Sequence, residues 1–394
     1  MLNPENNCRL PIGPLQPNQP IHEVMVPMAD VDINGDIDVG HGYRILGYYD
    51  VQNQVWRVSQ PSGEKLAIIW REGRARWTTG SLSEWQSIRH RLPAPEGLRS
   101  IQFPPIPVIP LNALPIPRTI HQLWIGTAIP SDVFFESVAR NGRHTEDFTS
   151  FLHTDVSDEL FITLTDRFRT VAPNLVVTRL QDSPFFQQFR NTRLYPHYQN
   201  ASTAPHTNYS AASDMLRYPL INYHGGVYID MDDYFLSNTT GMPLNAAPND
   251  LLLGSLTTKA DADFEGFNSS HFASHANNPV LARITEEMTV RCEQAPHFFN
   301  SPRQENIDAS GVDSHAVELF HLTGPQVLND VLALERPDYY NVGYLCTERH
   351  GPTSRIAVYD QVYTDNLIQI LAHYFPFNLR MPIFTGYENT WKHS

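Results

Sequence analysis

The sequence predicts an α/β domain with a central, mainly parallel sheet over residues 118–394, preceded by a small, mainly β domain. From residue 118 onward, short apolar runs of strand length alternate with longer runs whose apolar residues recur at helical spacing. This order is typical of a parallel sheet covered by helices. Hydrophobic residues make up 41% of the 394 residues, enough for a large core in a chain of roughly two or three domains.

The first 117 residues divide into two predicted parts. Residues 1–92 contain the runs YRILGYYDV, QVWRVS and KLAIIW, whose aromatic and β-branched residues and close turns predict a small antiparallel β domain. Residues 93–117 hold a dense group of prolines, which remove backbone donors and fix φ. We therefore expect this segment to be an extended connector or a sheet edge.

Residues 118–394 supply the elements of the α/β domain. The runs IHQLWI, LVVTRL, GVYIDM and DLLLGSL predict buried strands, and SDMLRYPLINY, NPVLARITEEM and TDNLIQILAHYF predict helices. Ser210 is expected to cap a helix that continues through Tyr223, and Gly225 and Gly226 to end it before the next strand.

Composition excludes several classes of function. With 28 basic and 42 acidic residues the formal net charge is −14, which disfavours nucleic acid as the main partner. The three cysteines fit neither a disulfide framework nor a zinc site. We expect no cleaved signal peptide and no transmembrane segment, because no run is long and apolar enough.

Paired carboxylates at a predicted strand end carry the chemistry. The strand GVYI runs into Asp230 and Asp232, which should point to the same side at the carboxyl end of the strand, where α/β sheets bind ligands. Their mutual repulsion calls for a cation, and Mg²⁺ or Mn²⁺ held by carboxylates and substrate phosphates fits. Asp214 and Arg217 share a helix face and suit hydroxyls and phosphate, although an ordinary surface ion pair is the alternative.

The segments IPRTIHQLWIG and AASDMLRYPLINYHGGVYIDMD resemble the DXD-containing sugar-binding-region glycosyltransferases. This family includes the catalytic domains of clostridial glucosylating toxins, related bacterial effectors and fungal mannosyltransferases. The resemblance covers residues 116–394 and implies a GT-A fold, a nucleotide-sugar donor and a divalent cation, Mn²⁺ or Mg²⁺. It says nothing about the first hundred or so residues.

The resemblance also implies roles for particular residues. Asp232 and Asp230 match the metal–diphosphate aspartates, and in the C-terminal run GYENTWKHS Asn389 matches a metal ligand and Trp391 a donor to the leaving diphosphate. The residues matched to donor binding are Trp124, Ser213, Asp214, Arg217, Tyr228, Asp230 and Asn268. Plain alternatives are core packing for Trp124 and Tyr228, a capping role for Asn268, and an unstructured tail for the last residues.

The expected function is retaining transfer of a hexose, glucose or N-acetylglucosamine, from a UDP-sugar to a protein acceptor, with Asp230, Asp232, Arg217 and Trp391 in the catalytic machinery. A secreted bacterial toxin or effector acting in the host cytosol, on a host GTPase or another host protein, fits the family and the lack of a membrane anchor. The alternatives are a glycosyltransferase that acts on a glycan or lipid, and a non-catalytic nucleotide-sugar-binding module.

Two further patterns are weaker. The run DVDINGDID over residues 30–38 spaces oxygens like a calcium loop, but His41 stands where an EF-hand needs glutamate, so a polar turn is favoured. His271 and His275 lie four apart without a zinc motif, and we expect a chance pair.

Overall fold

A computed structural model describes residues 107–339 and 361–386, except 204–206, 260–261, 302–306 and 309–310, together with the backbone of strands between residues 22 and 103. The chain forms two compact units. One consists of Met1–Val108 with Leu332–Leu371, and the other of Ile109–Val331 with Ala372–Ser394. The domain limits at residues 92 and 117 stay predictions, and each unit is described by itself. No helix in the described residues is long and apolar enough to span a bilayer.

The first unit contains antiparallel strands. Five of them form a meander in chain order: β2 (Asp36–Gly40), β3 (Tyr43–Leu46), β4 (Trp56–Ser59), β5 (Lys65–Arg71) and β6 (Arg74–Thr79). β1 (His22–Pro27) pairs with β7 (Leu98–Phe103), a strand within the proline-rich segment. Residues 30–35 of the calcium-like run lie outside the described residues. That residues 1–92 form a domain of their own also stays a prediction.

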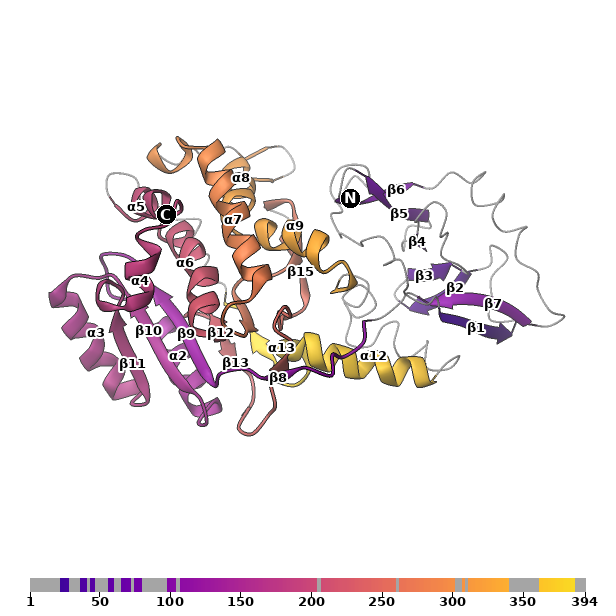
Figure 1. The fold of residues 1–394 in the computed structure, drawn as a ribbon, viewed down its shortest axis with the longest axis horizontal. Coiled ribbons are helices and arrows are strands. Elements are labelled where there is room, and N and C mark those ends of the chain that lie inside the picture. The colour runs from indigo at the N-terminus through magenta and orange to yellow at the C-terminus, as the bar shows by residue number, and fades with distance from the viewer. Residues whose placement is uncertain are drawn as a thin grey trace. The chain divides into compact units, whose positions relative to one another are not determined.

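The second unit is built on a five-stranded sheet in the order β11-β10-β9-β12-β17 (Figure 1). The first four strands run parallel and the edge strand β17 is antiparallel, so the predicted mainly parallel sheet is confirmed. The strands are β9 (Thr119–Trp124), β10 (Thr149–Thr154), β11 (Leu175–Arg179), β12 (Gly226–Ile229) and β17 (His271–Ser274). The run DLLLGSL is an exception. Its buried part, residues 250–254, forms only an isolated bridge from Leu252 to Ala273 of β17, and its last residue, Leu256, begins the short strand β15.

Helices cover both faces of this sheet (Figure 1). Leu152 of β10 packs in an apolar cluster with residues of α2 (Asp132–His144) and α3 (Asp158–Val171). The alternate residues of β10, Phe151 and His153, point to the other face, toward His224 of α6 (Tyr209–His224). Helices α4 (Pro184–Phe189), α5 (Tyr195–Ser202) and α7 (Pro279–Gln294) contact α6.

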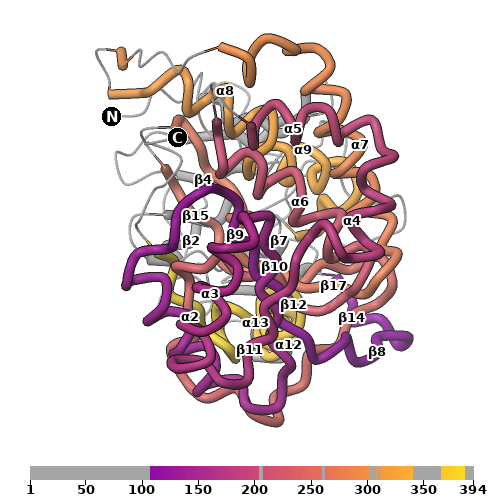
Figure 2. The backbone as a smooth tube through the Cα atoms, turned by 90° about the vertical axis from the view of Figure 1, so that its left-hand side faces the viewer, coloured from indigo at the N-terminus to yellow at the C-terminus, as the bar shows by residue number. Residues whose placement is uncertain are grey.

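Short elements complete the described chain. Phe377 of α13 packs in the same apolar cluster as Val227 and Ile229, and Figure 2 shows α13 close to β12. Three two-stranded pairs are β8 (Leu114–Pro115) with β14 (Asn245–Ala246), β13 (Tyr234–Phe235) with β18 (Ile383–Phe384), and β15 (Leu256–Lys259) with β16 (Phe264–Phe267). The remaining helices are η2 (Leu180–Asp182), η4 (Phe298–Asn300), α8 (Ser314–Leu322), α9 (Pro325–Glu335), α12 (Gln361–Tyr374) and α13 (Pro376–Leu379).

Helix α6 begins two residues earlier than expected. Its N-cap is Asn208, whose side chain accepts from the Ala211 backbone N–H at 3.0 Å, and Ser210 donates to Asn208. Asn208 takes this place because its carboxamide reaches the third residue on, as a cap requires. At the other end Gly225 and Gly226 have φ of +69° and +96°, and a Cβ on Gly226 would lie 2.2 Å from Thr119 Oγ1. The double glycine therefore lets β12 pack closely against β9.

A buried histidine pair lies between the sheet and α6. His121 Nδ1 and His153 Nε2 are 2.9 Å apart, and Thr119 and Thr178 hydroxyls lie at the outer nitrogens at 3.1 and 2.9 Å. Burial lowers the pKa of His153 to about 3, with the nearby His224 adding to the fall. Burial also holds the pKa of His121 well below its ordinary value. Burial disfavours the charged imidazolium form of either ring, and two imidazolium rings would set two N–H donors against each other. Both rings are therefore neutral in the folded protein.

This pair predicts acid sensitivity. Between about pH 6.5 and 3 the unfolded chain binds more protons at these histidines, so their contribution to stability is complete above about pH 6.5 and is lost as the pH falls. The free energy of unfolding should drop by a few kcal/mol from pH 7 to 4, and His153→Gln should flatten that drop. Urea unfolding at several pH values measures it, with His297→Gln, at an exposed histidine, as control. An unchanged pH profile in His153→Gln would contradict this assignment.

Candidate active site

The described part of the second unit holds a cavity of about 460 Å³ at the carboxyl ends of β9 and β12. Parallel α/β sheets bind ligands at this edge, because the loops that follow the strands converge there. Five segments supply most of the wall: the loop after β9, the first turns of α6, the turn after β12, residues 268–270 before β17, and Thr385 with Gly386 after β18. The hairpin β15–β16 and the end of α8 close another side.

Most of the predicted site residues meet in this cavity. Its lining includes Trp124, Ser213, Asp214, Arg217, Asp230, Asp232 and Asn268. Asn389 and Trp391 lie outside the described residues. Tyr228 is fully buried and does not line the cavity. Its hydroxyl contacts Asp230, which does. His271 and His275 diverge, as expected of a chance pair: His271 bonds to Asp233, whereas His275 bonds to backbone carbonyls of Leu114 and Ala246.

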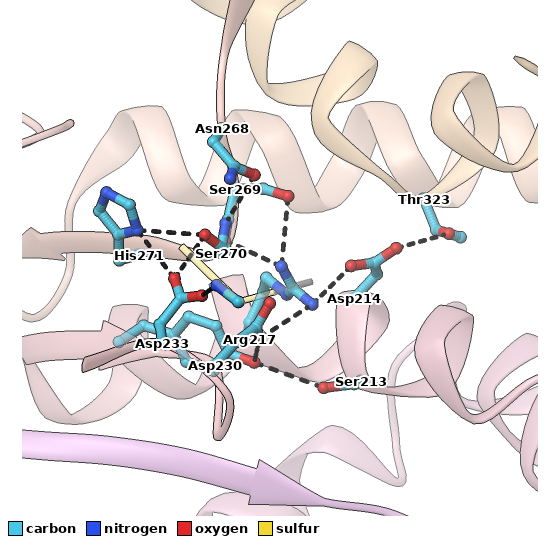
Figure 3. A network of polar contacts seen from close by, with 12 residues as sticks. Ser213, Asp214, Arg217, Asp230, Asp233, Asn268, Ser269, Ser270, His271 and Thr323 are labelled. Carbon is cyan, nitrogen blue, oxygen red and sulfur yellow. Dashed lines mark hydrogen bonds and ion pairs between the residues drawn. The ribbon is translucent and has the colours of Figure 1, made fainter. Parts of the chain in front are cut away.

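Arg217 is the centre of the polar network (Figure 3). Its Nη2 lies 2.7 Å from Asp214 Oδ1 and 3.4 Å from Asp230 Oδ1, and its Nη1 donates to the Ser269 carbonyl at 2.9 Å. The guanidinium also lies over the Tyr228 ring, 4.9 Å from the centroid. Only 5% of Arg217 is exposed, so the surface ion pair considered from the sequence does not apply. Arg217 ties α6, the turn after β12 and the segment before β17 together.

Negative charge exceeds positive charge around Arg217. Burial raises the pKa of Asp214 to about 7; Arg217 and the Thr323 hydroxyl oppose the rise, and Asp230 adds to it. Burial also raises the pKa of Asp230, which Arg217 opposes and Asp233 adds to. At both carboxyls the effect of burial outweighs that of Arg217, and a further cation near them would favour their ionised form.

Two hydroxyls orient these carboxyls. The Tyr228 hydroxyl donates to Asp230 Oδ1 at 2.6 Å, and Ser213 Oγ lies 3.4 Å from the same hydroxyl. Thr323, at the end of α8, donates to Asp214 Oδ2 at 3.2 Å. Asp214 is thus held from two sides, with one oxygen toward Arg217 and the other toward Thr323.

Trp124 has one side in the core and one in the cavity. Its ring meets Phe134 edge to face at 5.2 Å, and its Nε1 donates to the Ala128 carbonyl at 2.8 Å. The indole is therefore fixed in orientation while still lining the cavity. A fixed aromatic face at the cavity wall suits stacking on a planar base.

The turn after β12 differs from the predicted strand. β12 ends at Ile229, because the Asp230 N–H donates to the Ser270 carbonyl and the Asp233 N–H turns back to the Asp230 carbonyl. Asp230 and Asp232 still both face the cavity. Asn268 lines the cavity and makes a local turn, its Oδ1 accepting from the Ser270 N–H at 3.2 Å. It precedes strand β17, so the alternative of a helix cap does not apply.

Sequence reasoning missed three residues of the site. Asp233, 1% exposed, follows the Asp-Xaa-Asp run directly, and that adjacency was the available signal. Thr323 and Lys259 reach the network or the cavity from segments far along the chain. No local pattern marks them, since only the folded chain brings them to α6 and β12.

The carboxylates fit a divalent cation in part. In the described ranges, no group of three or more His, Cys, Asp or Glu side chains is arranged to hold a metal ion. Asp230 and Asp232 offer oxygen ligands at the cavity wall, which suits a Mg²⁺ or Mn²⁺ ion that takes its other ligands from substrate phosphates and water.

Comparison with known proteins agrees with this geometry. Residues 143–250 match the family described as glycosyltransferase sugar-binding region containing DXD motif. These residues resemble the sugar-binding region of a glycosyltransferase. The matched region includes Asp214, Arg217, Asp230 and Asp232, so these residues of the cavity wall lie in the part of the chain that resembles this family.

A curated relative is toxin Afp18 of Yersinia ruckeri, 24% identical over 176 residues, which are 44% of this chain and 8% of the toxin. The chain thus matches a small part of that relative's length. Among solved structures, PaToxG glycosyltransferase is 18% identical with a TM-score of 0.46, covering 71% of this chain and 84% of its own. The catalytic domain of α-toxin from Clostridium novyi is 12% identical with a TM-score of 0.41, covering 58% and 74%.

The network predicts that Arg217 stabilises the fold strongly. Arg217→Ala leaves the carboxyls of Asp214 and Asp230 buried without the guanidinium that they pair with. This should lower the free energy of unfolding by about 3–5 kcal/mol at alkaline pH. The loss should shrink in acid, where the carboxyls take up protons. Urea unfolding measures the free energy of unfolding of Arg217→Ala and of the control Arg169→Ala. The control breaks the exposed pair with Asp166 and should lose less than about 1 kcal/mol. Equal losses in the two variants would contradict this account.

Proposed function

We propose that the chain transfers a hexose from a UDP-sugar to a protein acceptor with retention at the anomeric carbon. The observation that carries the proposal is the convergence of Trp124, Arg217, Asp214, Asp230 and Asp232 on one cavity within the second unit. An aromatic face, a buried arginine and a group of carboxylates are the parts needed to bind base, sugar and diphosphate.

Each group has a task in binding the donor. The Trp124 face takes the nucleobase, and Asp214 accepts from hydroxyls of the sugar or ribose. Arg217 Nε is buried without an acceptor among the described residues, so the guanidinium keeps a donor for a sugar or phosphate oxygen. Asp230 and Asp232 hold the cation, Mn²⁺ or Mg²⁺, with Asn389 as a further ligand and Trp391 as a donor to the diphosphate.

Catalysis rests on fixed charge. The bound cation supplies electrostatic stabilisation for the departing diphosphate. Arg217, locked by Asp214, Asp230 and Ser269, keeps its positive charge in place while the glycosidic bond breaks, so little reorganisation is needed in the transition state. A front-face route accounts for retention: the acceptor oxygen bonds to the anomeric carbon on the side from which the diphosphate departs, and the leaving phosphate oxygen takes the proton of the acceptor hydroxyl as the glycosidic bond breaks.

Similarity to a toxin supports the proposed acceptor class and location. A toxin from Yersinia ruckeri shares 24% identity with this chain over part of its length, which supports a secreted bacterial effector that modifies a host protein such as a GTPase. Glucose and N-acetylglucosamine both remain candidate sugars. Intact-mass measurement of host proteins after incubation with each UDP-sugar identifies donor and acceptor together.

The carboxylate pair predicts dependence on metal. Asp230→Asn and Asp232→Asn should each lower UDP-sugar hydrolysis and transfer at least about 100-fold, because an amide is a poor ligand and the diphosphate loses its cation. EDTA should have the same effect on wild type, with recovery on adding Mn²⁺. Labelled UDP-sugars measure both reactions, and Asp182→Asn, at an exposed aspartate, is the control. Full activity in either variant would refute the proposed site.

A further inference from the structure

We infer that Asp233 is a positioning residue that holds the C-terminal segment against the Asp230–Asp232 turn, and that Gly386 in that segment fixes the place of the Asp232 carboxylate. This inference rests on the proposed function, because the segment leads to Asn389 and Trp391. We infer that Asp233 itself does not bind the cation, although it directly follows Asp232, a proposed cation ligand.

The two oxygens of Asp233 are already engaged. Oδ2 accepts from Ser270 Oγ at 2.7 Å and from His271 Nδ1 at 3.0 Å (Figure 3). Oδ1 accepts from the Gly386 backbone N–H at 2.8 Å. Three donors from two distant segments therefore satisfy a carboxylate that is 1% exposed. A metal ion at Asp233 would have to displace such donors, whereas the structure uses them to join the segments.

The C-terminal segment is attached to the same turn by its backbone. β18 pairs with β13, which follows the turn directly, through Tyr234 with Phe384 and Phe235 with Ile383. The Leu236 N–H donates to the Pro382 carbonyl at 2.8 Å, and the rings of Tyr234 and Phe384 stack at 4.8 Å. Gly386, which donates this hydrogen bond to Asp233, is the last described residue before the predicted ligand residues Asn389 and Trp391.

Gly386 also touches the proposed metal ligand. A Cβ on this residue would lie 2.3 Å from Asp232 Oδ2 and 2.4 Å from its Cγ. No side chain fits there unless the carboxylate moves, so the glycine is required by space. Asp233 fixes the Gly386 backbone, and the Gly386 backbone in turn limits where the Asp232 carboxylate can lie.

Two substitutions at Asp233 separate positioning from metal binding. Asp233→Ala removes the acceptor for Gly386, whereas Asp233→Asn keeps one oxygen for that N–H and offers an amide donor to Ser270 or His271, both able to accept. Gly386→Ala pushes on Asp232 from the other side. Loss of an outer partner of a metal ligand typically costs about 10–100-fold in metal affinity.

The experiment is a Mn²⁺ binding isotherm in the presence of UDP, read from the EPR signal of free Mn²⁺, with circular dichroism checking the fold. Asp233→Ala and Gly386→Ala should raise the half-saturating Mn²⁺ concentration about tenfold or more, and Asp233→Asn by less than about threefold. Controls are Asp182→Asn and Gly142→Ala, since Gly142 has open space around its Cβ position.

The outcomes distinguish the two proposals. Wild-type affinity in Gly386→Ala, or an Asp233→Asn defect as large as that of Asp233→Ala, overturns the positioning role, the latter in favour of direct metal binding. If Asp233→Ala does not fold, Gly386→Ala and Asp233→Asn decide by the same criteria. Wild-type protein that binds no Mn²⁺ with UDP overturns the proposed function itself, and this inference with it.

Discussion

The contact between Arg217 and the carboxylates of Asp214 and Asp230 is the interaction on which the site depends. One guanidinium joins a helix, the end of a central strand and the Ser269 backbone, with distances of 2.7 to 3.4 Å. Breaking a buried pair of this kind leaves charge without compensation, which is far more costly than losing a surface pair. The contacts of Arg217 therefore both shape the cavity and stabilise the second unit.

The same contact bears on the proposed cation site. Arg217 brings one positive charge to several carboxyls, and burial raises the pKa of both Asp214 and Asp230. In the proposed function, a divalent cation beside Asp230 and Asp232 would add positive charge next to these carboxyls and would bind the donor diphosphate. The formal charge of −14 is thus consistent with an anionic donor, because the acidic groups meet it through a cation and through Arg217.

Sequence reasoning reached the parts of the site that local patterns encode. Strand spacing and the double glycine placed Asp230 and Asp232 at the edge of a mainly parallel sheet, and the structure has both in the cavity wall. Strand length was overestimated, because the chain turns after Ile229, where the Asp233 N–H donates to the Asp230 carbonyl. The partnerships of Asp233 with Gly386 and of Asp214 with Thr323 span 153 and 109 residues, and no local pattern encodes such contacts.

The central claim is that Asp230 and Asp232 hold a cation that carries the donor diphosphate beside Arg217. A crystal structure with UDP and Mn²⁺, using the anomalous signal of manganese, tests it most directly. We expect an anomalous peak in contact with carboxylate oxygens of these residues, the diphosphate on the same ion, and the uracil against Trp124. UDP bound in the cavity without a manganese peak at these carboxylates, or with its base away from Trp124, would contradict the account.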